Sequence, residues 1–393
     1  MDRAAQRRFL LELIGTATAA DLAHFSPDDW TAMDSMAAQH RLQPLLHAMH
    51  GQRTEIPEEI RNAWRAAHRL SAIHALAQQA DLIETCTLLE RAGFAPVALK
   101  GAWLSRHAYP EAAQRPMRDL DLLVPPEQVI PAFHALLESG LQQESPAEMT
   151  VEEIVRLDKH MPPLTTPRGT RVELHHRLWE LDGRLDHASP DEASLTIKPV
   201  VTDPDGIRFL CPQEQLAHLI VHAVYSHRLD CGPLILSDIS VLIQKENIDW
   251  PQFWSDAARH GWRNGARLML ELVARYRPET RIDFSADKGP CAPAALLGFA
   301  PDLLLQDLDT RHSAGFAAAA LSGGSASLVA RLMGRRAAHH SAPAHRAHGG
   351  LGGLGGALHW AGSRLVRNVR DLARREVRQQ SRQLAALSTW LDQ

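Results

Sequence analysis

Two aspartates, Asp119 and Asp121, open a short apolar run that ends at Val124. Because side chains alternate between the faces of a strand, both carboxylates point one way, and Leu120 and Leu122 point the other. Paired carboxylates repel each other unless a cation lies between them, and a hard divalent ion that also binds phosphate oxygens meets that need. The spacing therefore predicts a site for Mg²⁺, with Mn²⁺ as the alternative ion. The competing interpretation is the water-facing side of an edge strand.

A third carboxylate lies in a second alternating run. Glu173 shares a face there with Arg171 and His175. We expect this strand to lie beside the first, which would bring Glu173 to the two aspartates and make it the third metal-binding and catalytic carboxylate. Lys159 and His160 precede the strand. They either face the site or belong to a solvated loop.

A Lys-Gly pair, Lys100 and Gly101, ends a third apolar run at 97–99 and precedes a helical pattern. Backbone N–H groups at the start of a helix are suited to bind phosphate. Three carboxylates beside such a helix start are the components for in-line displacement at a nucleotide phosphate. The phosphates of an NTP would then lie over Gly101. The basic residues predicted to bind the nucleotide with Gly101 are Lys100, Arg115 and Arg118.

Four motifs together resemble the uncharacterised nucleotidyltransferase branch of the polymerase-beta-like superfamily. They are LKG at 99–101, YP at 109–110, RPMRDLDLLV at 115–124 and VELH at 172–175. The resemblance implies that Asp119 and Asp121 are the metal-binding pair and Glu173 the third carboxylate. It also implies that Gly101 opens the phosphate-facing helix. Ala102 stands where the broader superfamily usually has Ser or Gly.

The leading hypothesis is a Mg²⁺-dependent nucleotidyltransferase that moves a nucleotidyl group from an NTP, with ATP as the first donor to test. The acceptor would be a peptide, a small molecule or a protein, with His175 and His222 on the acceptor side. Members of the resembled family often lie beside genes for modified peptides or surface polysaccharides, which favours a natural-product or polysaccharide pathway. His222, His227 and Asp238 resemble residue types that the family often carries.

Two other functions stay open. The first is a non-catalytic module with a nucleotidyltransferase-like fold, which binds a peptide or a partner enzyme and keeps the carboxylates as structure. The second is a divalent-metal phosphohydrolase, for which His175, His218 or His222 would have to converge on the aspartates. His218 and His222 are four residues apart and share a helix face, although the HExxH zinc pattern is absent.

The patterns along the chain predict an α+β fold, with a small mixed-sheet nucleotidyltransferase core flanked by N-terminal and C-terminal helical regions. The predicted regions are 1–92 (helical), 93–200 (core), 201–312 (helical), 313–358 (flexible, rich in Gly, Ala and His) and 359–393 (a basic amphipathic helix). The basic helix would dock on an acidic partner, RNA or an anionic membrane surface, or fold back on its own domain.

Composition narrows the class of protein. The chain has 393 residues, 45% of them hydrophobic, with a mean hydropathy of −0.23, which predicts a soluble globular protein. A formal net charge of −4 does not favour nucleic acid as a partner, although a local basic patch is not excluded. The four cysteines form no C-x-x-C pair, and the chain has neither a convincing signal peptide nor an apolar run near the ~20 residues that span a bilayer. We therefore expect a cytoplasmic protein.

Overall fold

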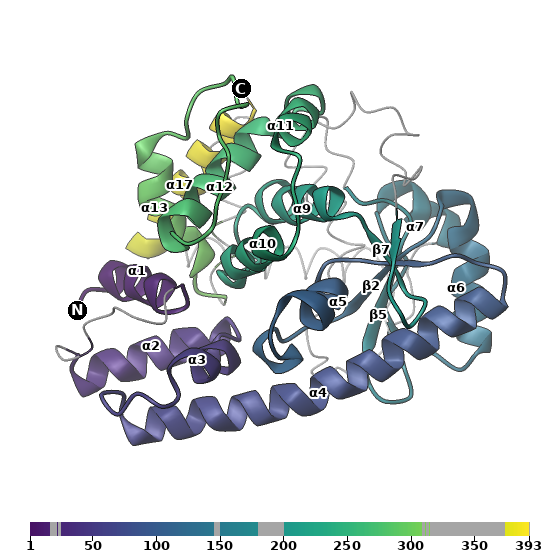
Figure 1. Ribbon diagram of the computed structural model, residues 1–393, viewed down its shortest axis with the longest axis horizontal. Helices are drawn as coiled ribbons and strands as arrows, with labels where there is room; N and C mark the ends of the chain where they lie inside the picture. The colour runs from purple at the N-terminus through teal and green to yellow at the C-terminus, as the bar shows by residue number, and fades with distance from the viewer. Residues whose placement is uncertain are drawn as a thin grey trace, which may run out of the picture. The chain divides into compact units, whose positions relative to one another are not determined.

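A computed structural model describes residues 1–15, 22, 25–144, 150–179, 200–308, 311, 314 and 374–392 (Figure 1). The chain forms two compact units, Met1–Leu305 and Gln306–Gln393. Except for residue 314, the predicted flexible segment 313–358 lies outside the described residues, as do residues 359–373 of the predicted basic helix. Among the described helices, none has the length and apolar character required to cross a membrane.

A seven-stranded mixed sheet forms the centre of the first unit, with the strand order β3-β4-β5-β2-β1-β7-β6. The strands are β1 (Val97–Ala98), β2 (Leu120–Leu123), β3 (Gln142–Gln143), β4 (Leu164–Thr165), β5 (Arg171–His175), β6 (Val200–Thr202) and β7 (Arg208–Leu210). The pairs β2/β5 and β1/β7 are parallel, and the other neighbouring pairs are antiparallel. The predicted mixed sheet is therefore confirmed.

The register between β2 and β5 aligns the acidic residues. Asp121 lies opposite Glu173, and Leu123 lies opposite His175. Leu120 and Leu122 are fully buried, so the apolar positions of β2 hold the strand inside the protein. An edge strand with its acids in water is therefore not what the structure shows, since β2 lies between β1 and β5.

Four helices precede the sheet in the chain. They are α1 (Arg3–Leu13), α2 (Pro27–Gln39), α3 (Gln43–His50) and α4 (Glu58–Arg91). A capping box begins α2, since the Ser26 side chain accepts the Asp29 N–H and the Asp29 carboxylate accepts the Ser26 N–H. The long helix α4 packs against α2 and α3 and also against α6 (Val129–Glu138), so it links the helical region to the sheet (Figure 1).

Further helices follow the sheet in the chain. They are α9 (Pro212–Val221), α10 (Leu234–Lys245), α11 (Trp250–Arg259), α12 (Arg263–Tyr276) and α13 (Ala294–Leu304) in the first unit, and α17 (Arg375–Leu391) in the second. Helices on both sides of the core in sequence confirm the predicted fold class. The division of the first unit at residues 92 and 200 stays a prediction, as does the role of the basic C-terminal helix.

One helix was not predicted. The structure places α7 (Val151–Leu157) within the predicted core region 93–200. Thr150 and Glu153 form its capping box, because the Thr150 hydroxyl accepts the Glu153 N–H and the Glu153 carboxylate accepts the Thr150 N–H. The Thr-x-x-Glu pattern was the signal that could have revealed this helix.

Candidate active site

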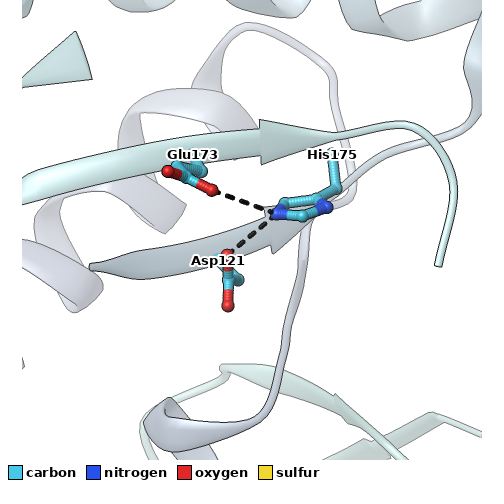
Figure 2. A group of neighbouring side chains, drawn as sticks. All are labelled: Asp121, Glu173 and His175. Carbon is cyan, nitrogen blue, oxygen red and sulfur yellow. Dashed lines mark hydrogen bonds and ion pairs between the residues drawn. The ribbon is translucent and has the colours of Figure 1, made fainter. Parts of the chain in front are cut away.

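Asp121, Glu173 and His175 form one cluster on the adjacent strands β2 and β5 (Figure 2). The Nε2 atom of His175 lies 2.8 Å from Oδ1 of Asp121 and 3.8 Å from Oε2 of Glu173. One nitrogen or oxygen atom from each of the three residues lies within 4.8 Å of the others. Parallel pairing produces this geometry, since residues in register on neighbouring strands point to the same face.

Asp119 lies immediately before β2 and is half-buried. Burial, together with the negative charges of Asp121 and Glu173, raises the pKa of Asp119 to about 7. The three predicted carboxylates therefore act on one another electrostatically. Asp119 does not belong to the group whose ligand atoms converge within 4.8 Å, which among the described residues consists of Asp121, Glu173 and His175.

Asp121 and Glu173 are nevertheless held as charged carboxylates. Burial opposes the charge of Asp121, but Lys100 and His175 bring its pKa well below the usual range. Burial also opposes the charge of Glu173, but His160 and other cationic neighbours lower its pKa. One of those neighbours is Arg171, whose Nη2 lies 2.9 Å from Oε1 of Glu173. Two of the three acids are thus ionised at neutral pH.

Lys100 reaches the cluster from the end of β1. Its Nζ lies 3.0 Å from Oδ2 of Asp121 in a mostly buried ion pair. Burial opposes the ammonium, but Asp121 and the other two carboxylates raise the pKa of Lys100 above its usual value. The Lys100 backbone has φ 46° and ψ −111°, a conformation that favours glycine. In this structure Lys100 is thus the ion-pair partner of Asp121.

Gly101 begins α5 (Gly101–Trp103), which continues as the π-helix η1 (Leu104–Ala108). A Cβ atom on Gly101 would lie 2.2 Å from Nη1 of Arg115 and 2.9 Å from the sulfur of Met117. A side chain at this position would push the Arg115 guanidinium and the Met117 sulfur out of their places against this turn. The sequence assigned Gly101 to phosphate binding, and the structure adds a steric reason for the same residue.

Arg115 forms a bidentate ion pair with Asp238 of α10. Its Nε donates to one Asp238 carboxylate oxygen at 3.2 Å and its Nη2 to the other at 2.9 Å. The Tyr109 hydroxyl also donates to Asp238, at 2.9 Å. Sequence reasoning selected Arg115 and noted Asp238 separately, but it did not pair them. Arg118, the other arginine predicted to bind nucleotide, is exposed.

The histidines of the site fall into two groups. His160 lies beside His175, with ring centroids 5.1 Å apart and its Nε2 3.6 Å from Oε2 of Glu173. His222 lies at the start of η4 (His222–Ser226), with its ring centroid 4.3 Å from that of His227 and 6.1 Å from that of His218. Of these rings, His175 meets the carboxylates directly, whereas His222 packs among other histidines.

Lys100 acts on this second group as well. Burial lowers the pKa of His218 and His222 well below the usual value, and the nearby Lys100 ammonium lowers both further. Lys159 contributes to the same shift and is itself buried. His160 therefore faces the site and Lys159 is buried, which favours the first of the two interpretations of this segment over a solvated loop.

The donor set suits a divalent cation. Carboxylate oxygens are the preferred ligands of Mg²⁺ and Mn²⁺, and an imidazole nitrogen is also a metal ligand. Asp121, Glu173 and His175 present atoms of these kinds within reach of one ion. The negative charge of Asp119 would add to the attraction for the ion. We therefore take this cluster as the candidate metal site.

A family model described as uncharacterised nucleotidyltransferase matches residues 26–278. The chain belongs to this family. The matched region contains the carboxylates, Lys100 and the buried histidines, so the nucleotidyltransferase part of the chain is the part that carries the site. The family makes nucleotidyl transfer from an NTP the reaction class. The chain has no significant match among curated proteins or solved structures.

The raised pKa of Asp119 predicts that metal affinity depends on pH. Below its pKa of about 7 the Asp119 carboxyl is protonated in the metal-free nucleotidyltransferase, so a metal ion has to displace that proton. Asp121 and Glu173 have lowered pKa values and stay charged over this range. We expect the affinity for Mn²⁺ to rise about tenfold per pH unit up to pH ~7 and to level off above it.

Calorimetric titration of Mn²⁺ between pH 5.5 and 8 measures this dependence. The Asp119→Asn variant, which has no proton to lose, should bind Mn²⁺ more weakly and with a flatter pH profile. A wild-type affinity that is the same at pH 6 and pH 7.5 would contradict the prediction.

Proposed function

We propose that this member of the uncharacterised nucleotidyltransferase family catalyses Mg²⁺-dependent transfer of a nucleotidyl group, with ATP as the donor. An acceptor oxygen or nitrogen attacks the α-phosphorus of the nucleotide. The new bond forms as the bond between that phosphorus and the bridging oxygen of the leaving pyrophosphate breaks. The acceptor proton passes to a base or to solvent, and pyrophosphate is the second product.

One observation carries this proposal, the register that sets Asp121 opposite Glu173 on parallel strands with Asp119 in the same electrostatic field. Asp119, Asp121 and Glu173 are the proposed metal ligands and catalytic carboxylates. A bound divalent ion would supply Lewis-acid stabilisation of the phosphate charge. Mn²⁺ is the proposed substitute, because Mn²⁺ accepts the same oxygen ligands.

The other residues of the site receive roles around the nucleotide and the acceptor. We assign Gly101, with Lys100, Arg115 and Arg118, to the phosphate side. His175 and His222 are assigned to the acceptor side, and the lowered pKa of His222 favours the neutral imidazole, which accepts a proton. His175 also orients Asp121 through the 2.8 Å contact.

The sequence resemblance is the support for the proposed acceptor and pathway. We propose a peptide, small-molecule or protein acceptor in a natural-product or polysaccharide pathway. A cytoplasmic location agrees with the four cysteines, which are all free thiols in the structure. For the basic C-terminal helix we propose an acidic partner or an anionic membrane surface.

Pyrophosphate release from each of the four common NTPs with Mg²⁺ tests the proposed reaction, with candidate acceptors added in turn. We expect release from ATP by the wild type and a loss of at least about a hundredfold in Asp119→Ala, because one metal-binding carboxylate is removed. Circular dichroism and a thermal melt should show that the variant is folded.

The competing function, a non-catalytic binding module, predicts a different result. In that case nucleotide and Mg²⁺ bind in calorimetry, and no acceptor leads to pyrophosphate release. Glu173→Ala would then alter binding without any rate to lose. Failure of the wild type to release pyrophosphate from any NTP with any acceptor of the proposed classes would contradict the enzyme assignment.

A further inference from the structure

The two oxygens of the Asp121 carboxylate face two different positively charged or hydrogen-bonding groups. Oδ1 lies 2.8 Å from Nε2 of His175, on the side of the cluster that contains Glu173. Oδ2 lies 3.0 Å from Nζ of Lys100. Asp121 therefore bridges two neighbouring positions, and a side chain of the protein already supplies a cation at one of them.

The ammonium and a metal ion exclude each other at Oδ2. A Mg²⁺ or Mn²⁺ ion binds a carboxylate oxygen at roughly 2.0–2.2 Å and demands near-octahedral ligand positions. With Nζ at hydrogen-bonding distance from the same oxygen, such an ion would lie against a like-charged ammonium at close range. Two-metal sites for phosphate chemistry need both positions, with the ions about 3.5–4 Å apart.

The backbone shows that Lys100 is held in place. Its φ of 46° is unfavourable for a residue with a side chain. The turn is fixed on both sides, since the Leu99 N–H donates to the Asp121 carbonyl and the Leu104 N–H donates to the Lys100 carbonyl. The surrounding fold thus keeps a lysine at a strained position from which its ammonium meets Asp121.

The charges of the site agree with one metal ion. Three carboxylates contribute three negative charges when ionised, and Lys100 returns one positive charge. The charge of Arg171, which lies beside Glu173, is balanced by Glu144, with which Arg171 also pairs. One divalent ion completes neutrality, whereas two would leave an excess of positive charge in a mostly buried cluster before any nucleotide arrives.

We propose that Lys100 is a built-in cation that occupies one of the two cation positions at Asp121, so that the protein binds a single divalent ion on the side of Glu173 and His175. This inference rests on the proposed function for its metal, and it gives Lys100 a role at the carboxylates in place of a direct role at the phosphates. The Lys100 ammonium balances the negative charge of Asp121, so that no second metal ion from solution is required there.

Counting bound Mn²⁺ by electron paramagnetic resonance of nucleotide-free protein tests the proposal at pH 8. We expect one ion per chain for the wild type. Lys100→Met removes the charge at nearly the same length and should bind two ions with a spin-coupled signal, since both oxygens of Asp121 become available. Lys100→Arg is the matched control and should still bind one ion, because it keeps a cation on the same backbone. Thermal melts report whether each variant is folded.

Each other outcome is decisive. Two ions in the wild type, or a single ion in folded Lys100→Met, would overturn the proposal, as would a wild type that binds none. A wild type that binds one ion and releases no pyrophosphate would contradict the proposed function and leave the assignment of Lys100 intact.

Discussion

Glu173→Gln is expected to lower the rate of pyrophosphate release about a thousandfold and to leave the protein folded. The substitution removes one of the charges that would hold the catalytic ion, and a loss of ~4 kcal/mol of transition-state stabilisation corresponds to three orders of magnitude. The fold should tolerate the change, because the Gln side-chain carbonyl can still accept from Arg171, which lies 2.9 Å from Glu173. Steady-state kinetics with saturating Mg²⁺ measure the effect.

Glu144→Gln is the matched control for this variant. Glu144 pairs with Nη1 of the same Arg171 at 3.4 Å, but it is exposed and lies outside the carboxylate cluster. The same chemical change should therefore leave the rate within about twofold of the wild type. Equal losses in the two variants would mean that Glu173 contributes by pairing with Arg171 and not by binding a metal ion.

Arg115→Met is expected to destabilise the protein by about 3–5 kcal/mol and to lower its melting temperature by roughly 5–15 °C. The change leaves the Asp238 carboxylate buried without its bidentate partner, which is the costly way to break a buried ion pair. Tyr109 still donates to Asp238 and recovers part of the loss. Denaturant unfolding and thermal melts give the two quantities.

Two comparisons isolate the buried charge as the cause. Adding Asp238→Asn to Arg115→Met should restore half of the lost stability or more, since a neutral amide still accepts from Tyr109 and no unpaired charge remains. Arg259→Met removes an exposed pair with Asp256 and should cost less than about 1 kcal/mol. A loss of similar size in Arg259→Met and Arg115→Met would contradict the argument.

Strand alternation predicted part of the site, because it is a pattern within a few neighbouring residues. Alternation predicted that Glu173 and His175 share a face, and the structure has both beside Asp121. Alternation also implied that Asp119 shares that face, but the strand begins after this residue, and its carboxylate does not converge with the others within 4.8 Å. The period of a strand stops applying where the strand ends.

Pairings between distant segments could not be predicted in this way. Lys100 and Arg115 both looked like phosphate ligands, because a basic residue near a glycine-led helix suggests that role. The structure gives each of them a carboxylate partner, Asp121 for Lys100 and Asp238 for Arg115. Their assignment to the nucleotide therefore stays a prediction, and the metal count described above tests it for Lys100.

The sequence by itself determined the alternation of the acidic strands and the α+β class, because periodicity acts over a few neighbouring residues. Only the tertiary structure decided that β5 lies beside β2 with Asp121 opposite Glu173, and that α10 delivers Asp238 to Arg115. Strand order and helix packing arise from the burial of apolar faces across the whole unit. No short stretch of sequence contains that information, so the cluster that we take as the active site exists only in the folded chain.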